Sequence, residues 1–214
     1  MMIKVAARDS NLSKAQVEEF KKKLVQIDPS IEIHPVFMKS YGDKNHNISL
    51  RESGYDDLFT KEIDEAVLRG DADLALHSAK DIPETLSEEL EMYYLSQSIH
   101  PSDALVIKDG YSIDRIPKNG IIMASSFRRE EHIKKLRQDF ICRDVRGAIE
   151  QRLAYLNNPE VYGVVVAEAA IIRLKLVHLN RILLDGETHP KQGMLAALGL
   201  KSNHHLRQLI GRLN

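Results

Sequence analysis

A lysine and an aspartate stand side by side in the segment HSAKDIP, at Lys80 and Asp81. The apolar run ADLAL before them has the composition of a buried strand, and Pro83 stops regular strand pairing. A strand that ends in this way can present its next charged side chains to a cleft. An aspartate there could move a proton or stabilise a cation that develops in a substrate, whereas the simpler interpretation is a turn residue in a solvated loop.

Arginines gather at predicted strand ends and helix starts in the second half of the chain. Guanidinium groups grip carboxylates in a bidentate fork, and helix N-termini add positive partial charge, so the cluster suits a ligand with several carboxylates. The alternative is that they are surface charges paired with acidic neighbours such as Glu130 and Asp144. The five residues are Arg128, Arg129, Arg143, Arg146 and Arg152.

Short β-rich runs alternate with amphipathic helices, which predicts an α/β fold with mixed, mostly parallel sheets flanked by helices. Ser125 or Ser126 is the expected N-cap of the helix that carries the Arg-Arg pair. Strands are predicted at 3–7, 31–38, 72–78, 90–96, 103–107, 121–126, 140–145 and 162–168, and helices at 13–27, 57–70, 127–137, 148–157 and 169–176.

Two segments between or after these elements have their own patterns. Residues 96–103 are polar and contain Pro101, so they are predicted to be a crossover or hinge between two lobes. Residues 191–214 have a helical pattern, apart from a Gly- and Asn-containing break near 199–204.

Composition limits the function classes. The 214 residues are 43% hydrophobic and 29% charged, as in an ordinary globular protein of one large domain or two small ones. A formal net charge of -1 argues against nucleic acid and acidic membranes as partners. The start MMIKVAARDS lacks the apolar core of a signal peptide, and no run approaches the roughly 20 apolar residues of a membrane span, so a cytoplasmic protein is expected.

Metal, nucleotide and disulfide chemistry are not indicated. The nine histidines show no metal-ligand spacing, and no glycine-rich phosphate-binding motif is present. Cys142 is the single cysteine, so no intramolecular disulfide can form. It lies in the strand-like run FICRDV, where a small apolar filler is the usual role and a reactive thiol is the alternative.

Several segments, taken in order along the chain, resemble porphobilinogen deaminase, also called hydroxymethylbilane synthase. The motifs HS-x-KD-x-P at 77–83 and SS-x-RR at 125–129 carry the resemblance, together with ARDSNLSKAQ at 7–16, SDALV at 102–106 and VVAEAAIIRL at 165–174. The resemblance implies a transferase that condenses four porphobilinogen units head to tail into hydroxymethylbilane, with release of ammonia, in tetrapyrrole (haem) biosynthesis. Its partners would be porphobilinogen and polypyrrole intermediates, and a monomer is expected.

The family's functional residues carry over by position. Asp81 matches the catalytic aspartate, which helps to protonate the departing amine and stabilises cationic azafulvene and pyrrole intermediates. The residues that match substrate- or cofactor-binding positions are Arg8, Ser10, Gln16, Lys80, Ser126, Arg128, Arg129, Arg146, Arg152 and Arg173.

The resemblance also implies an architecture, in which two lobes resemble type II periplasmic binding proteins and enclose the active site. Lobe one would comprise 1–95 and 188–214, and lobe two 100–184. Hinge segments would lie at 96–99 and 185–187.

The chain departs from the family pattern in three places. The family has a third, C-terminal domain whose cysteine attaches a dipyrromethane primer, and both that domain and that cysteine are expected to be absent here, because Cys142 falls inside lobe two. Glu52 and Asp56 stand where the family has loop lysines, which reverses the local charge. The family's RGN is Arg146-Gly147-Ala148, and its G-Q-G-A becomes KQGM at 191–194.

Three functions are compatible with these observations. The first is a truncated deaminase that holds its dipyrromethane noncovalently or loosely. The second is a catalytically weakened two-lobe binding protein for a pyrrole or another small polycarboxylate. The third is a fragment or remnant that needs a partner chain.

Overall fold

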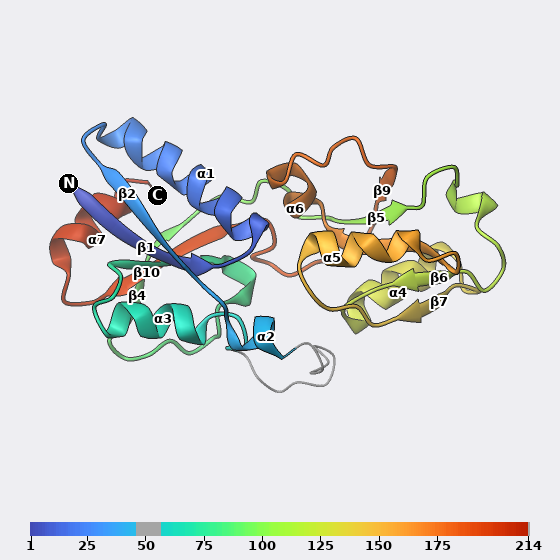
Figure 1. Ribbon diagram of the computed structural model, residues 1–214, viewed down its shortest axis with the longest axis horizontal. Coiled ribbons are helices and arrows are strands. Elements are labelled where there is room, and N and C mark those ends of the chain that lie inside the picture. Colours follow the sequence, from blue (N-terminus) through green and yellow to red (C-terminus); the bar gives the residue numbers. More distant parts are fainter. Residues whose placement is uncertain (46–56, 214) are drawn as a thin grey trace. The chain divides into compact units, whose positions relative to one another are not determined.

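Each part of the chain is built around one mixed sheet. The computed structural model describes residues 1–45 and 57–213, and these form two units (Figure 1). Unit 1 comprises Met1–Asn45, the described residues up to Ile99, and the chain from Gly193 onward; unit 2 comprises His100–Gln192.

The chain crosses between the two units twice, and only the first crossing falls within a segment predicted for it. The first crossing lies at Ile99, within the predicted crossover at 96–103. The return comes at Gly193 rather than at residues 185–187. The reason lies in unit 2, where Thr188 and Gln192 both donate hydrogen bonds to the carbonyl oxygen of Pro101, at 2.6 and 2.8 Å.

The sheet of unit 1 has the strand order β2-β1-β3-β10-β4 among the described residues. Its strands are β1 (Met2–Arg8), β2 (Glu32–Met38), β3 (Leu74–Ser78), β4 (Leu90–Leu95) and β10 (Leu195–Leu200). β1 pairs in parallel with β2 and β3, whereas β10 runs antiparallel to β3 and β4. The carboxyl ends of β1 to β4 and the start of β10 therefore lie at one edge.

Helices cover both faces of this sheet (Figure 1). α1 (Asn11–Ile27) and α7 (His204–Gly211) pack on the face to which β1 contributes Ile3 and Val5. α3 (Lys61–Leu68) packs on the opposite face, against Ala6 and its neighbours. The alternation along β1 follows from the two-residue period of a strand. A short helix, α2 (Tyr41–Lys44), follows β2, and the 3₁₀ turn η1 (Ala79–Asp81) follows β3.

The helical pattern predicted for residues 191–214 is wrong for its first part. Residues 195–200 form β10, which lies between β3 and β4. Both faces of β10 are covered, so Leu195 to Leu198 are all fully buried and the run shows no alternation. Periodicity does not distinguish such a run from a buried helix. Only the part after the break, capped by Asn203, is helical.

The sheet of unit 2 has the order β7-β6-β8-β5-β9. Its strands are β5 (Asp103–Ile107), β6 (Ile121–Met123), β7 (Ile141–Arg143), β8 (Val161–Ala167) and β9 (Arg181–Leu183). β6 is parallel to β7 and β8, whereas β5 is antiparallel to β8 and β9. Asp103, the first residue of β5, therefore lies at the edge where the other strands end.

Helices also cover both faces of the second sheet. α4 (Phe127–Leu136) buries Ile133 against Leu105 and Phe140 on one face. α5 (Ile149–Leu153) and α6 (Glu168–Arg173) pack on the other face, around Val164 and Ile171. Two 3₁₀ turns, η2 (Ile113–Arg115) and η3 (Ala154–Asn157), complete the unit. The predicted α/β class with mixed sheets is confirmed, and no described helix has the length and apolarity needed to cross a membrane.

Candidate functional site

The predicted catalytic aspartate lies in the turn that ends β3. Asp81 is half-exposed, and its carboxylate has no hydrogen bond or ion pair to any residue that the structure describes. The turn is anchored by its buried first residue, Ala79, whose N–H donates to the carbonyl of Met194 on the way into β10, at 3.0 Å. A fixed backbone thus presents a carboxylate that the described residues do not engage.

Helix α1 is tied to the same edge. Gln16, buried on α1, donates from Nε2 to the hydroxyl of Ser78, the last residue of β3, at 2.9 Å. Ser10 is the N-cap of α1, because its hydroxyl accepts from the N–H of Ser13 at 3.1 Å. Both residues were predicted to contact a ligand, and here they also position the helix and the strand end that carries Asp81.

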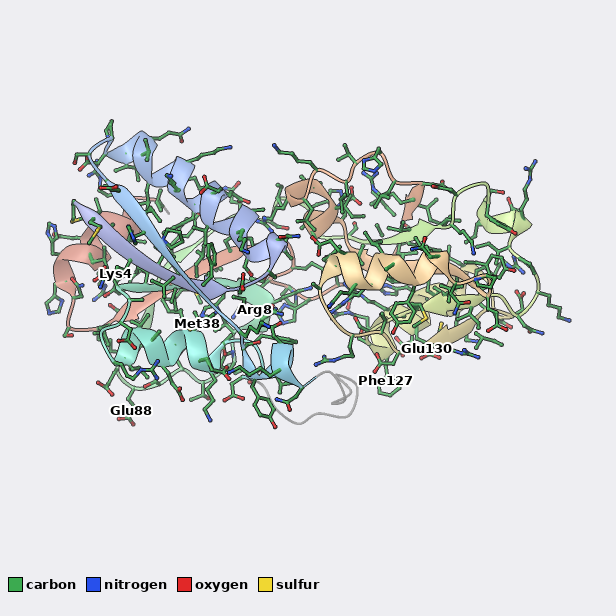
Figure 2. The ribbon with its side chains drawn as sticks, viewed as in Figure 1. Lys4, Arg8, Met38, Glu88, Phe127 and Glu130 are labelled. Atoms are coloured by element: carbon green, nitrogen blue, oxygen red, sulfur yellow. The ribbon has the colours of Figure 1, made fainter. Side chains whose placement is uncertain are left out.

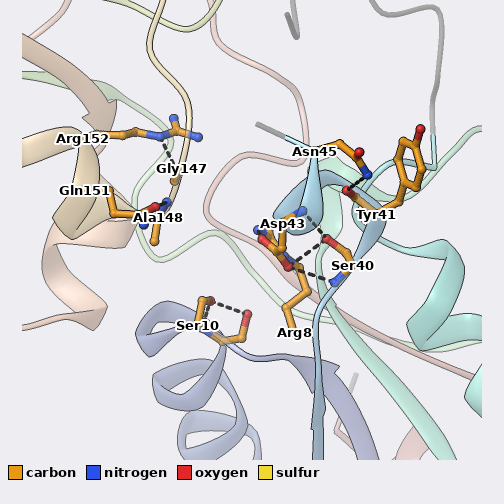
Figure 3. A network of polar contacts seen from close by, with 11 residues as sticks. Arg8, Ser10, Ser40, Tyr41, Asp43, Asn45, Gly147, Ala148, Gln151 and Arg152 are labelled. Carbon is orange, nitrogen blue, oxygen red and sulfur yellow. Dashed lines mark hydrogen bonds and ion pairs between the residues drawn. The ribbon is translucent and has the colours of Figure 1, made fainter. Parts of the chain in front are cut away.

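Arg8 ends β1 beside Met38, the last residue of β2 (Figure 2). Its guanidinium is held by Asp43 of α2, with Nε donating to Oδ2 at 3.2 Å and Nη2 to Oδ1 at 2.5 Å (Figure 3). The guanidinium also lies over the ring of Phe59, with its carbon 4.3 Å from the ring centre. Arg8 is therefore fixed by an internal carboxylate and an aromatic face.

Asp43 is itself fixed by the start of α2. Its Oδ2 accepts from the N–H and the hydroxyl of Ser40, at 3.0 and 2.8 Å, in a capping box. Burial pushes the pKa of Asp43 up, but the hydrogen bonds and charge of Arg8, with the donors of Ser40, outweigh it and hold that pKa below its ordinary value. Gly42 allows this packing, since a Cβ there would lie 2.5 Å from the Phe59 ring.

A buried ion pair stands at the corresponding edge of unit 2. Asp103 is fully buried and accepts from Nε of Arg129 at 3.0 Å and from Nη2 at 2.5 Å. Nη1 of Arg129 donates to Ser125 at 2.9 Å, and Gln192 also donates to Asp103, at 3.1 Å. Arg129, predicted to bind a ligand, thus uses all three guanidinium nitrogens inside the protein.

Arg128, unlike Arg129 on the same helix, has a guanidinium nitrogen that no described residue pairs with. Ser126 caps α4, accepting from the N–H of Arg129 at 3.4 Å, so Arg128 lies in the first turn. Arg128 is half-exposed, and its Nε is buried without a hydrogen-bond acceptor among the described residues. Buried donors are normally paired, so this nitrogen is a natural contact for an anionic group.

The segment from β7 to α5 brings two more of the predicted arginines to this edge. Arg152 donates from Nε to the carbonyl of Gly147 at 2.8 Å (Figure 3). Its Nη1 donates to Ser125 at 3.4 Å. Gly147 has a φ of +99°, which favours glycine. Arg146, one residue earlier, is half-buried. The side chain of Gln151 accepts from the N–H of Ala148 at 2.9 Å and closes the turn.

Two of the predicted arginines, Arg8 and Arg129, are held by carboxylates that the sequence did not single out, Asp43 and Asp103. Arg173 ends α6, whose first residue, Glu168, is buried and paired with Arg181 at 2.7 Å. That hydrogen bonding raises the pKa of Arg181. Asp103 had one available signal, because it is the charged first residue of the otherwise apolar strand DALVI. Asp43 had none, since its partner is fixed only by the fold.

Three further predictions concern the rest of the chain. Glu52 and Asp56 lie outside the described residues. Within the described ranges, no group of three or more His, Cys, Asp or Glu side chains is placed to hold a metal ion. Cys142 lies on β7, half-buried against the apolar cluster beneath α4.

The family model "Porphobilinogen deaminase, dipyromethane cofactor binding domain" matches residues 3–208. The chain belongs to the porphobilinogen deaminase family. It is 37% identical to a probable porphobilinogen deaminase of Ignicoccus hospitalis, over 95% of this chain and 68% of that protein. It is 36% identical to the porphobilinogen deaminase of Caldicellulosiruptor saccharolyticus, over 99% of this chain and 73% of that protein. The family predicted from the motifs is therefore confirmed.

Solved structures confirm the predicted fold type. The methionine binding protein MetQ matches with a TM-score of 0.60 at 11% identity, covering 99% of this chain and 89% of that one. A substrate binding domain of a putative amino acid ABC transporter from Streptococcus pneumoniae matches with a TM-score of 0.55 at 12% identity, covering 100% and 91%. This chain thus has a type II periplasmic binding-like fold.

Proposed function

We propose that this chain condenses four porphobilinogen units head to tail into hydroxymethylbilane, with Asp81 as the catalytic residue. The observation that carries the proposal is the carboxylate of Asp81, presented by an anchored turn and engaged by no described residue, in a chain of the porphobilinogen deaminase family. A carboxylate that the fold does not need for its own ion pairs is available for chemistry.

Asp81 would act on the nitrogens of the substrate. In each cycle the aminomethyl C–N bond breaks and ammonia leaves, a C–C bond forms to the free α-carbon of another pyrrole, and that carbon then loses its proton. One carboxylate oxygen can hold a proton for the departing amine, and the ionised group can stabilise the cationic azafulvene. The half-exposed position of Asp81 allows both roles.

The basic residues would hold the substrate's acetate and propionate groups. Lys80 stands next to Asp81, and Arg8 lies at the end of the neighbouring parallel strand. In unit 2, Arg128 is the best placed, because its buried Nε has no acceptor among the described residues. Arg129 would act as a positioning residue, since Asp103 and Ser125 already occupy its nitrogens. Further carboxylate contacts are assigned to Arg146, Arg152 and Arg173.

Dipyrromethane, when bound, supplies the primer to which pyrroles are added. The edge of unit 2 fits such a polycarboxylate, because Arg128, whose buried Nε has no acceptor among the described residues, lies in the first turn of α4 after the Ser126 cap. Arg146 and Arg152 would be the other residues that hold it. Cys142 is a poor attachment point, since it belongs to β7 and contacts the apolar cluster beneath α4. We therefore propose that noncovalent contacts of Arg128, Arg146 and Arg152 hold the primer's carboxylates in unit 2.

Asp81→Asn and Glu84→Gln test the proposal as a matched pair. Glu84 is an exposed carboxylate three positions further along the same segment. Protein shown to be folded by circular dichroism would be incubated with porphobilinogen, acidified and oxidised, and the porphyrin absorption band and released ammonia measured. We expect Asp81→Asn to reduce the rate by about 10²- to 10⁴-fold and Glu84→Gln to leave it unchanged.

Two results would overturn the proposal. If Asp81→Asn retains the wild-type rate, Asp81 is not the catalytic residue. If the folded wild-type chain binds porphobilinogen in a calorimetric titration without releasing ammonia, the chain is a binding protein of this fold instead.

A further inference from the structure

Arg8 is a predicted ligand-binding residue of unit 1, and its charge is matched by a carboxylate of the described chain, that of Asp43. Nε and Nη2 donate to Asp43, whereas Nη1 has no hydrogen bond to another described residue. The side chains of the two residues are 23% and 21% exposed, so the pair is only partly shielded from an incoming ligand. A ligand carboxylate can therefore reach Arg8 without first displacing Asp43.

The charge of this pair decides how strongly Arg8 attracts an anion. The pKa of Asp43 lies below its ordinary value, so the carboxylate is ionised at neutral pH and the pair carries no net charge. An approaching carboxylate then meets a dipole rather than an isolated cation. The carboxylate of Asp43 is held in place, because the N–H and the hydroxyl of Ser40 both donate to it. The guanidinium of Arg8 is held as well, because it lies over the ring of Phe59.

We propose that Asp43 is a specificity-determining residue that offsets the charge of Arg8 and limits its affinity for ligand carboxylates. This inference rests on the proposed function for the identity of the natural ligand. An arginine weakened in this way contributes little to binding a monocarboxylate. Ligands with several carboxylates still bind, because their contacts act together. A weaker individual contact also lets a product with many carboxylates leave.

The chain supplies a matched control in unit 2. Arg137 donates to Asp139 from Nε at 3.1 Å and from Nη2 at 2.6 Å, and lies 4.4 Å from the ring centre of Phe140. This pair has the same ion pair and aromatic face as Arg8, Asp43 and Phe59, but Nη1 of Arg137 is also occupied, donating to the carbonyls of Ile113 and Ile116 at 3.0 and 2.8 Å. It lies at the far end of α4, after the helix has ended at Leu136, and belongs to none of the strand-end groups assigned to ligand binding.

Asp43→Asn and Asp139→Asn test the proposal by isothermal titration at low ionic strength. Two probes are used, porphobilinogen and citrate, a tricarboxylate without a pyrrole. Arg8→Gln serves as the variant that removes the cation. We expect Asp43→Asn to bind both probes about three- to tenfold more tightly, with the gain shrinking as salt is added. Asp139→Asn should bind like wild type, and Arg8→Gln more weakly.

The outcomes separate this proposal from the proposed function. If wild type does not bind porphobilinogen but Asp43→Asn binds citrate more tightly, the proposed function fails and the role of Asp43 stands. If folded Asp43→Asn binds both probes with unchanged or lower affinity, the role of Asp43 is wrong. If no variant binds either probe, Arg8 is not a carboxylate site and the proposal falls as well.

Discussion

Replacing Arg129 by alanine should destabilise unit 2 strongly. Asp103, which is 0% exposed, accepts two hydrogen bonds from the Arg129 guanidinium, at 3.0 and 2.5 Å. Removing the guanidinium leaves a buried carboxylate without its opposite charge. Breaking a buried ion pair by removing one partner costs about 3–5 kcal/mol, so we expect Arg129→Ala to lower the free energy of unfolding by this amount.

Urea denaturation of the full chain, followed by circular dichroism, measures this loss. Arg128→Ala is the control, because Arg128 is the preceding residue on α4 and is half-exposed. Its effect on the free energy of unfolding should stay within about 1 kcal/mol. Adding Asp103→Asn to Arg129→Ala should recover part of the loss, because the buried charge is removed, so the two changes should not be additive.

The stabilising role of the buried Asp103–Arg129 ion pair is refuted if Arg129→Ala and Arg128→Ala denature at the same urea concentration. It is also refuted if Asp103→Asn in the Arg129→Ala background gives no recovery. The result bears on function, since a loss of activity in Arg129→Ala does not by itself assign Arg129 to ligand binding. Such an assignment needs a binding measurement on protein shown to be folded.

Two further predictions concern unit 1 chemistry and unit 2 backbone. The pKa of Asp43 is lowered in the folded state, so the ionised carboxylate stabilises the fold. Wild type should therefore exceed Asp43→Asn in free energy of unfolding by a constant amount above about pH 5, and this difference should vanish as the pH falls through the depressed pKa, below about 4. A difference in denaturation midpoint that does not change with pH would contradict this. Gly147→Ala places a Cβ against Gln151 at a φ of +99° and should cost about 1–3 kcal/mol. Gly110→Ala is the control, because Gly110 has a φ of +82° but no atom within 4 Å of the added Cβ, and it should cost about 1 kcal/mol. If both variants lower the Tm equally, the contact with Gln151 does not contribute to the cost at Gly147.

Local elements were predictable because their causes lie within a few residues. The strand at 103–107 has the predicted bounds, and α1 begins at Asn11, two residues before the predicted start, because Ser10 caps it. Gly70, the last residue of the helix predicted at 57–70, has a φ of +79° and lies beyond the end of α3 at Leu68. Periodicity, caps and turn residues act over one or two turns of chain, so they can be read without the fold.

Two kinds of feature were missed for the same physical reason. β10 was assigned to a helix, because its burial between β3 and β4 removes the alternation by which strands are predicted. β9 was not predicted, since a three-residue edge strand carries little pattern. In both, pairing with a strand distant in sequence decides the structure, and propensity yields to that pairing.

The family could be identified from short motifs whose residues are neighbours in the chain, and the order of most helices and strands from local periodicity. The contacts of each charged group, by contrast, depend on how the chain folds in three dimensions. Asp43 meets Arg8 across 35 positions and Asp103 meets Arg129 across 26, while Asp81 meets no described partner. The reason is that parallel strands bring their carboxyl ends to one edge of the sheet. Residues that are far apart in the sequence meet at this edge, and their spacing along the chain does not reveal which of them will be neighbours.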